Sequence, residues 1–457
     1  MCWKPEYIIL IIVSTCIDYF AGIMMGKTKE GSKKKKYLYL SLISNLGLLF
    51  LFKYFNFFST SVHTLFYQFN IFYNAPTFKL LLPVGISFYT FQTLSYTIDV
   101  YRGKKEPEKN FGIFAVYVSF FPQLVAGPIE RATNLLPQFY KKHKFDYDRV
   151  SNGLKLMLWG FFKKLVIADR LAILVNTVYN NPTGYTGLPL ILATIFFAFQ
   201  IYCDFSGYSD IAIGASQVLG YNLMDNFKRP YFSKSIQEFW QRWHISLSTW
   251  FKDYVYIPLG GNRGVKWRWY YNLSITFIIS GLWHGANWTF LAWGAIHAFY
   301  IVFAILTKDF KTKVVTTLKL NTFPLIYKYT QILMTFSLVC FAWIFFRSNN
   351  IADALYIVSN IFSGTIKTGI SIINFDLNEL KDLILGDGLG LNRYQLIIAF
   401  ISILFMETIH LIQRHGGMRH MLSKKPYWFR MLIYYLLILL IMFFGIFQKS
   451  QFIYFQF

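Results

Sequence analysis

The feature that most constrains this chain is a series of apolar stretches, each about as long as a helix needs to cross a bilayer, roughly 20 residues. The clear candidates are 7–25, 37–58, 80–101, 165–180, 188–205, 326–346, 395–413 and 430–448. Hydrophobic residues make up 55% of the chain and charged residues only 15%, unlike a soluble protein. We therefore predict an all-α polytopic membrane protein with roughly 10–11 membrane segments, some of them re-entrant or embedded.

Three further regions are predicted to be membrane-embedded but irregular. Two of them begin and end among basic residues, so each must return to the side from which it started. Region 111–127 is either a re-entrant hairpin or an embedded helix that faces the cytosol. Region 269–306 contains no charged residue and is too short for two full crossings with a loop. We expect it to form a hairpin inside the membrane, with His284 at the tip.

The basic residues predict which loops face the cytoplasm. The net charge is +23, but Lys and Arg lie in short loops between apolar stretches, so membrane topology explains them better than nucleic-acid binding, and we expect no nucleic-acid partner. The predicted cytoplasmic segments are 27–36, 102–110, 131–164, 221–268, 307–325 and 414–430. Segment 348–394 is acidic and is predicted to be extracytoplasmic, as are both termini. We see no internal repeat or long linker, so 1–457 is expected to be one integral-membrane domain.

The cysteines predict neither a metal site nor a disulfide framework. The four cysteines are widely spaced and form no C-x-x-C pair, so no metal ligand is assigned. The first apolar stretch carries Asp18 and lacks a convincing signal-cleavage site, so we expect it to remain as a membrane helix.

His284 lies in Gly-Leu-Trp-His-Gly-Ala-Asn-Trp, residues 281–288. A titratable side chain at membrane depth is expensive, which makes His284 a candidate catalytic residue. The structural alternative is a neutral imidazole that hydrogen-bonds a carbonyl and locks the hairpin. Gly281 and Gly285 allow the two backbones to approach closely.

A second histidine, His244, follows Trp243 in a segment of interfacial character. Ser235 and Glu238 have capping-box spacing, and apolar residues then recur every three or four positions to Tyr254. This pattern predicts one amphipathic helix at the cytoplasmic interface, where His244 is either an interfacial histidine or part of a site.

Two more groups of polar residues are weaker candidates for substrate binding. The turn 258–264, which contains Arg263 and is followed by Lys266 and Arg268, combines flexible backbone with basic side chains. It either suits a polyphosphate such as that of coenzyme A or is a plain cytoplasmic turn. Asp204, Ser206 and Asp210 follow an apolar helix and either orient a substrate or cap the next helix. The pair Lys163 and Lys164 is interpreted only as a determinant of topology.

Several sequence blocks occur together and in order. They are Pro-Gln-Leu-Val-Ala-Gly-Pro-Ile (122–129), Tyr-Cys-Asp-Phe-Ser-Gly-Tyr-Ser-Asp (202–210), Phe-Trp-Gln-Arg-Trp-His-Ile-Ser-Leu-Ser-Thr-Trp (239–250), Ile-Pro-Leu-Gly-Gly-Asn-Arg (257–263), the block at 281–288, and the closing Phe-Ile-Tyr-Phe-Gln-Phe (452–457). With these blocks the chain resembles a membrane-bound O-acyltransferase, most closely the bacterial alginate O-acetylation branch. Members of that branch usually have another apolar helix before the region that here begins at Trp3, so the start is either misassigned or truly lacks that helix.

The resemblance implies tilted helices around a funnel that admits the acyl donor from the cytoplasm and the acceptor from the other side. It implies that His284 is the catalytic histidine and His244 a second catalytic position. We also predict substrate contacts from Trp243 and Asn287. The implied donor is acetyl-CoA, with no permanently bound cofactor, and the implied acceptor is a polysaccharide. A separate SGNH-type or AlgX/AlgJ-like extracytoplasmic partner is implied as well, in a bacterial cytoplasmic (inner) membrane.

The predicted chemistry is direct acyl transfer, in which neutral His284 takes the proton of an acceptor hydroxyl that attacks the thioester. Burial favours a neutral imidazole, and His244 would orient substrate or polarise the carbonyl. An acyl-enzyme at Cys203 or Ser206 is the alternative route, with no adjacent base visible in the sequence. The other acceptors considered are a teichoic acid, lipid or protein hydroxyl. A transporter is the rival class, and it predicts two related halves that we do not find.

Overall fold

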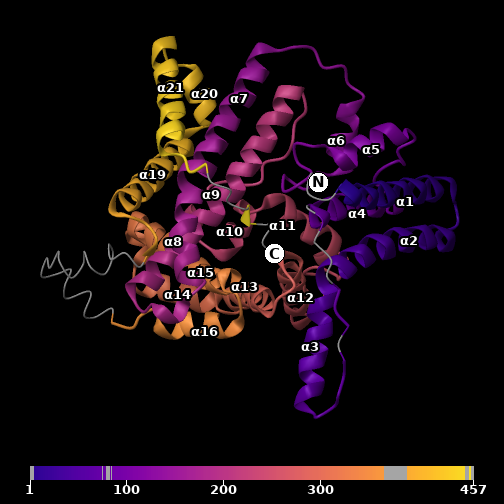
Figure 1. Cartoon of the computed structure of the whole chain (residues 1–457), viewed down its shortest axis with the longest axis horizontal. Coiled ribbons are helices and arrows are strands. Elements are labelled where there is room, and N and C mark those ends of the chain that lie inside the picture. The colour runs from indigo at the N-terminus through magenta and orange to yellow at the C-terminus, as the bar shows by residue number, and fades with distance from the viewer. Residues whose placement is uncertain are drawn as a thin grey trace, which may run out of the picture. The chain divides into compact units, whose positions relative to one another are not determined.

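The computed structural model describes residues 5–74, 76–78, 83, 85–364, 389–447 and 452–453, and within these residues the secondary structure is helical, with no strand (Figure 1). Seven helical segments are long and apolar enough to cross a membrane. They are Ile8–Lys27, Gly31–Gln68, Leu188–Leu219, Trp288–Leu306, Pro324–Arg347, Arg393–Ile412 and Tyr427–Phe444. The predicted all-α, multi-pass membrane fold is confirmed.

The chain forms two compact units. The first consists of Met1–Gly153 with Ala215–Asp225 and Phe457, and the second of Leu154–Gly214 with Asn226–Gln456. The elements of the first unit are η1 (Pro5–Tyr7), α1 (Ile8–Lys27), α2 (Gly31–Leu49), η2 (Phe50–Tyr54), α3 (Phe55–Gln68), α4 (Ile86–Tyr101), α5 (Phe111–Ser119) and α6 (Ala132–Phe139), with the start of α7 (Tyr147–Phe161).

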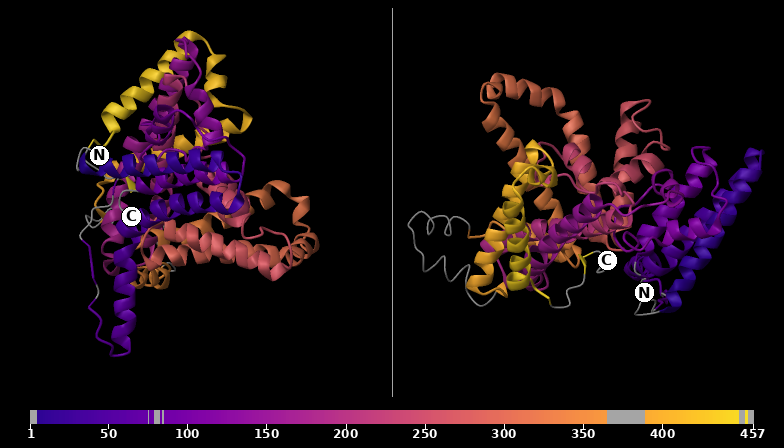
Figure 2. Two further views of the ribbon diagram at one scale, coloured as in Figure 1. Left: turned by 90° about the vertical axis from the view of Figure 1, so that its right-hand side faces the viewer. Right: turned by 90° about the horizontal axis from the view of Figure 1, so that it is seen from above.

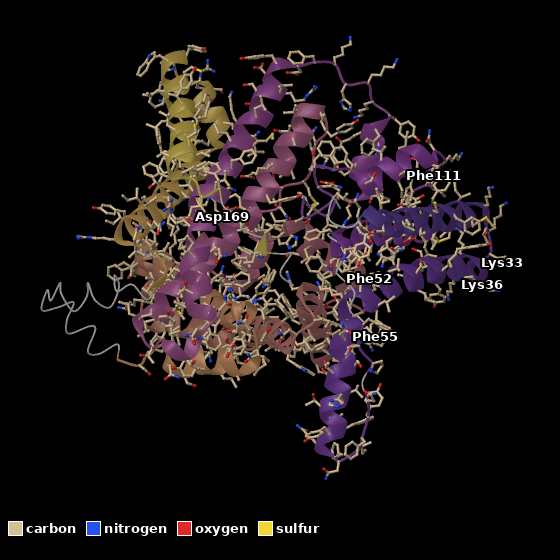
Figure 3. All side chains as sticks on the ribbon, in the orientation of Figure 1. Lys33, Lys36, Phe52, Phe55, Phe111 and Asp169 are labelled. Carbon is tan, nitrogen blue, oxygen red and sulfur yellow. The ribbon has the colours of Figure 1, made fainter. Side chains whose placement is uncertain are left out.

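Helices α1, α2 and α4 pack against one another around a buried carboxylate (Figures 1 and 2). Asp18 on α1 accepts hydrogen bonds from Ser41 Oγ at 2.6 Å and Asn45 Nδ2 at 2.9 Å, both on α2. Ser41 also donates to Thr97 on α4 at 3.0 Å. A buried carboxylate is tolerated here because donors from a neighbouring helix replace its water. Lys33 and Lys36 lie at the start of α2, next to the turn from α1 (Figure 3).

The predicted segment 37–58 is part of a longer helix that bends. Helix α2 passes into α3 through the π-helical η2, and the chain changes direction there, near Phe52 and Phe55 (Figure 3). A π-helical turn inserts an extra residue into the hydrogen-bond ladder, which is a known cause of helix bending. Residues after α3 run back along it, with Asn56 bonded to both backbone groups of Phe78.

Region 111–127 contains one short helix rather than a two-armed hairpin. Helix α5 has nine residues, about 13 Å in length, which is too short to cross a bilayer. Its N-cap Asn110 accepts a hydrogen bond from Ile113 N at 3.2 Å. The predicted helix 80–101 begins only at Ile86, and residues 79–82 and 84 lie outside the described residues.

The second unit holds the candidate site. Its elements are the end of α7, η3 (Phe162–Ala168), α8 (Asp169–Tyr179), η4 (Pro182–Gly184), α9 (Leu188–Leu219), η5 (Pro230–Phe232), α10 (Ile236–Arg242), α11 (Ile245–Phe251), η6 (Lys252–Tyr256), α12 (Lys266–His284), α13 (Trp288–Leu306), α14 (Lys308–Thr317), η7 (Leu320–Thr322), α15 (Pro324–Arg347), α16 (Ile351–Asn360), α19 (Arg393–Ile412), η9 (Gln413–His415), α20 (Met418–Ser423) and α21 (Tyr427–Phe444). The acidic residues of segment 348–394, which was predicted to be extracytoplasmic, fall mainly at 376–387, outside the described residues.

Two predicted membrane segments of this unit have different limits. The segment 188–205 continues as α9 to Leu219, because the polar residues at 204–210 do not interrupt the helix. The segment 165–180 is η3 and α8, continuous with α7, and is not among the seven spanning candidates. It carries charged residues that are buried inside the unit, so its apolar residues pack against protein.

The predicted hairpin at 269–306 is present as α12 and α13, which pack along their length. The turn takes only residues 285–287, so each arm has 19 residues, about 28 Å. The length alone therefore does not exclude two crossings, contrary to the expectation above. A Cβ on Gly281 would lie 2.3 Å from Phe290 O, and one on Gly294 would lie 2.5 Å from Phe277 O. The hairpin depends on these two glycines.

We expect Gly281→Ala to destabilise the protein by about 1–3 kcal/mol, because the added Cβ meets backbone that cannot move independently. Gly47→Ala on α2 is the matched control, since a Cβ there meets nothing within 4 Å. Unfolding by SDS in mixed micelles measures both, and equal midpoints would show that the hairpin does not need this close approach.

Candidate active site

His284 is the last residue of α12 and is enclosed by aromatic rings. Its side chain is 3% exposed. The imidazole centroid lies 5.0 Å from that of Trp293 on α13 and 5.3 Å from that of Phe346 on α15, with the ring planes steeply inclined in both pairs. After His284 the chain turns at Gly285, where a Cβ would lie 2.1 Å from the Phe290 ring. The turn thus places the predicted catalytic histidine inside the second unit.

His244 occupies a break between two helices. The predicted single amphipathic helix over 235–254 is wrong, because α10 ends at Arg242 and α11 begins at Ile245. His244 itself has left-handed backbone, with φ 42° and ψ 56°, which costs a non-glycine residue about 1–2 kcal/mol. The predicted cap is present, since Ser235 Oγ accepts from Glu238 N at 3.1 Å, while Glu238 in turn accepts from Lys234 N.

Asn226 stabilises this break. Its Oδ1 accepts hydrogen bonds from the Ser246 backbone N at 3.2 Å and from Ser246 Oγ at 2.9 Å. Its Nδ2 donates to Ser209 on α9 at 3.3 Å, and its carbonyl oxygen accepts from Ile245 N at 3.0 Å. The helix cannot continue through His244 because the first donors of α11 are bound to this asparagine.

His244 is fully buried, so the interfacial alternative does not describe it. Its ring contacts Phe205 on α9, with centroids 4.5 Å apart and planes nearly perpendicular. Burial lowers the pKa of His244 well below its ordinary value, because the surrounding rings cannot solvate an imidazolium. His244 is therefore neutral at physiological pH.

Trp283 links the two histidines. Its ring centroid is 5.0 Å from that of His284 and 6.0 Å from that of His244. Phe205, which contacts His244, lies between Asp204 and Ser206 in the chain. The structure thus brings together three of the sequence blocks, those on α9, at the α10–α11 break and at the α12–α13 turn.

The polar residues of α9 are engaged in buried ion pairs. Lys163 Nζ lies 2.7 Å from Asp210 Oδ2 and donates to Ser206 Oγ at 2.9 Å. Lys164 Nζ lies 2.7 Å from Asp204 Oδ1. These residues are inside α9 and do not cap a helix, so the capping alternative is wrong.

The two lysines therefore do more than set topology. Lys164 also pairs with Asp169 at 2.7 Å. Burial opposes the charge of Lys164, but the carboxylates of Asp204 and Asp169 outweigh it and raise the pKa of Lys164 above its ordinary value. Asp204 also accepts a hydrogen bond from Ile453 N at 2.7 Å.

The remaining predicted substrate contacts lie in different surroundings. Trp243 is buried, with its ring 5.1 Å from those of Phe227 and Trp343. Asn287 is the N-cap of α13, where its side chain accepts from Thr289 N at 3.0 Å. Arg263 is exposed in the turn after η6. The roles of Asn287 and Arg263 in substrate binding stay predictions.

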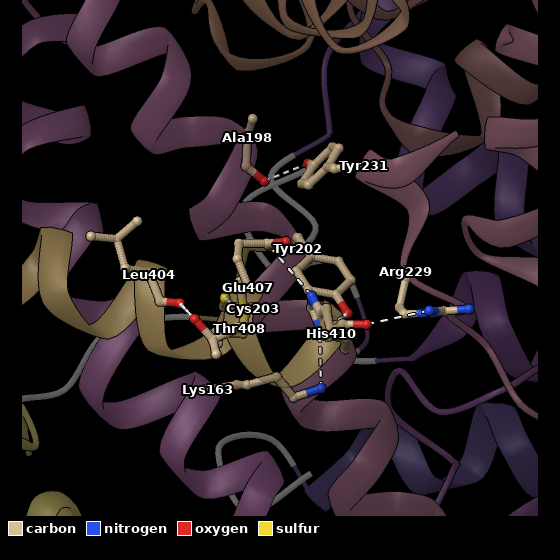
Figure 4. Close-up of polar contacts among 12 residues, drawn as sticks. Lys163, Ala198, Tyr202, Cys203, Arg229, Tyr231, Leu404, Glu407, Thr408 and His410 are labelled. Carbon is tan, nitrogen blue, oxygen red and sulfur yellow. Dashed lines mark hydrogen bonds and ion pairs between the residues drawn. The ribbon is translucent and has the colours of Figure 1, made fainter. Parts of the chain in front are cut away.

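A hydroxyl–imidazole–carboxylate chain was not predicted from the sequence (Figure 4). Tyr202 Oη lies 3.2 Å from His410 Nε2, and His410 Nδ1 lies 3.3 Å from Glu407 Oε1. The Tyr202 ring also lies 6.2 Å from Trp243, the residue before His244. The sequence did contain a sign of this chain of contacts. His410 is a titratable residue within the apolar stretch 395–413, just as His284 is within the apolar region 269–306.

Comparison with known proteins identifies the family of this site. Residues 109–346, which include both histidines and their aromatic neighbours up to Phe346, match the membrane-bound O-acyltransferase family. The chain belongs to this family. It is therefore an acyltransferase, as the resemblance predicted.

Several relatives of this acyltransferase are named for acyl transfer to cell-surface polymers. The chain is 38% identical over 406 residues to a probable alginate O-acetylase AlgI of Pseudomonas syringae, covering 88% of this chain and 73% of that protein. It is 34% identical over 391 residues to a peptidoglycan O-acetyltransferase of Helicobacter pylori, covering 79% and 71%. It is 29% identical over 291 residues to a teichoic acid D-alanyltransferase of Bacillus subtilis, covering 59% and 70%.

We expect Lys164→Met in this acyltransferase to lower the free energy of unfolding by about 3–5 kcal/mol, because two buried carboxylates lose their cation. The matched control is Lys33→Met, which removes a pair whose side chains are each 62% exposed and should cost no more than about 1 kcal/mol. SDS unfolding measures both. A loss no larger than that of the control would contradict the buried pairing.

We expect the stability of the enzyme to fall with acid in a way that depends on His244. The folded protein resists protonation of His244, whereas the unfolded chain binds that proton below about pH 6.5. Each pH unit below that value should therefore cost up to about 1.4 kcal/mol, a loss that His244→Gln removes. Thermal unfolding of both proteins between pH 7 and pH 5 tests this, and parallel curves would contradict it.

Proposed function

We propose that this acyltransferase moves an acetyl group from cytoplasmic acetyl-CoA to a hydroxyl of an extracytoplasmic or cell-surface polysaccharide, with His284 as the general base. The observation that carries the proposal is the enclosed position of His284 at the α12–α13 turn, where a base is shielded from water. The names of the relatives support transfer of acetyl groups to polymers of this kind.

The mechanism needs one base and no permanently bound cofactor. His284 accepts the proton of the acceptor hydroxyl as its oxygen attacks the thioester carbonyl. The tetrahedral intermediate then expels the thiolate, which takes the proton back from the imidazolium. Enclosure by Trp283, Trp293 and Phe346 keeps water from competing as the acceptor.

His244 is proposed to act beside His284 as a neutral group that orients substrate or polarises the carbonyl. The Asn226 hydrogen bonds stabilise the left-handed backbone at His244, and Phe205 packs against its ring. A neutral imidazole carries one N–H, which is a suitable donor to a carbonyl oxygen. Its contact with Trp283 places it next to the residue that precedes the base.

Direct transfer is favoured over an acyl-enzyme. Lys163 donates a hydrogen bond to Ser206 and is also paired with Asp210, so it contacts that hydroxyl as a donor and not as a base. Cys203 Sγ lies 3.3 Å from the sulfur of Met406. Within the described part of the chain, neither candidate nucleophile is hydrogen-bonded to a histidine that could act as its base.

A teichoic acid is the second candidate acceptor, supported by the resemblance to the teichoic acid D-alanyltransferase of Bacillus subtilis. The proposed location is the bacterial cytoplasmic membrane. An SGNH-type or AlgX/AlgJ-like extracytoplasmic protein is the proposed partner for delivery to the polymer. The exposed basic turn with Arg263 is the proposed contact for the phosphates of coenzyme A.

We expect His284→Ala to reduce polymer acetylation by at least about 100-fold at equal membrane expression, because the reaction loses its base. The measurement is acetate released by mild base from exopolysaccharide and, separately, from wall glycan and teichoic acid. His63→Ala is the matched control, since His63 is exposed on α3. If the His284→Ala variant acetylates fully while a deletion strain does not, His284 is not the base. The structural alternative, an imidazole that locks the hairpin, would then hold.

A further inference from the structure

One face of α13 carries three buried polar side chains beside the proposed base. Thr289, Trp293 and His297 recur every four residues, so they lie in a row along the helix. All three are fully buried, and Thr289 Oγ1, Trp293 Nε1 and His297 Nε2 each have no hydrogen-bond partner among the residues that the structure describes. Buried polar groups are normally satisfied, so a row of three indicates partners that the described residues do not supply.

Trp293 is the member of this row that lies against His284. The two ring centroids are 5.0 Å apart and the planes are inclined by 83°. The indole ring therefore borders the imidazole that the proposed reaction uses as its base. A buried N–H left without an acceptor is unfavourable, and a bound carbonyl oxygen would supply that acceptor.

Neighbouring rings hold the Trp293 side chain in one orientation. It stacks on Trp343 with centroids 5.9 Å apart and contacts Phe346 at 5.2 Å and His297 at 4.9 Å. A donor that does not reorient during the reaction is what stabilises developing negative charge best. The nearby Trp240 differs, because its N–H donates to His297 Nδ1 at 3.3 Å.

We propose that Trp293 is a catalytic residue whose indole N–H stabilises the oxyanion of the acyl-transfer reaction. The proposal rests on the proposed function, acyl transfer from a thioester with His284 as base. When the acceptor O–H bond breaks, its proton goes to His284 and the new C–O bond forms. The carbonyl π electrons move to the oxygen, which accepts the N–H of Trp293. Collapse restores the carbonyl, breaks the C–S bond and returns the proton to the thiolate sulfur.

The test compares Trp293→Phe with Trp240→Phe in the purified full-length enzyme, using acetyl-CoA and a hydroxyl acceptor on which the wild type is active. Loss of one oxyanion donor should lower kcat by about 100–1,000-fold. KM and the binding of a nonreactive thioether analogue of acetyl-CoA should stay within about twofold, because the N–H acts mainly in the transition state. Trp240→Phe removes an indole that contacts Trp293 but whose N–H is already used, so its kcat should fall by less than about tenfold.

A second variant separates chemistry from folding. Replacement of Trp293 by benzothienylalanine keeps the ring shape and substitutes sulfur for the N–H. It should lower kcat to the same extent, with a melting temperature no lower than that of the wild type. An unchanged kcat in this variant would overturn the proposal. The N–H would then have only a structural role, such as a hydrogen bond to a buried water. A wild-type enzyme that transfers no acetyl group would instead refute the proposed function.

Discussion

The second unit depends on a close crossing between the helix that runs through α7 and η3 and the long helix α9. Each helix has a glycine at the crossing, and a Cβ on Gly160 would lie 2.6 Å from Gly207 O. This approach brings Lys163 and Lys164 within ion-pair distance of carboxylates on α9. Each of these charges would cost several kcal/mol if it were buried without its partner. The ion pairs therefore depend on the close helix approach that the two glycines allow.

The same crossing positions the candidate site through Phe205, which lies between Asp204 and Asp210 on α9. Phe205, adjacent to Asp204, supports His244, and Asp204 also accepts from Ile453 N, whose neighbour Phe452 contacts Phe205. The strained backbone at His244 persists because surrounding contacts determine it more strongly than local preference does. Trp283 then connects this region to the α12–α13 turn. Rigid aromatic packing provides the preorganised, water-excluding environment that acyl transfer requires.

Much of this arrangement could be predicted from residues alone. The apolar stretches predicted membrane helices, and the basic residues that flank 269–306 predicted the hairpin, because helix length and loop charge depend on local composition. Gly281 and Gly285 beside His284 indicated the close backbone approach. The Ser235 cap was also predicted, since an N-cap bond spans only three residues. The break at His244 was not, because the amide that causes it belongs to Asn226, eighteen residues earlier, and apolar spacing on both sides of the break is continuous.

The sequence by itself determined that the chain folds in a membrane, that it is helical and that it belongs to the acyltransferase family. It also singled out His244 and His284 as the candidate catalytic residues. These depend on apolar length, on local spacing and on short motifs. Only the tertiary structure decided that Lys163 and Lys164 pair with carboxylates on α9. It also decided that His244 is buried rather than interfacial, and that Trp293 lies beside His284. Charge pairing and ring contacts between distant segments depend on how helices cross, and the residues of one segment do not specify that crossing.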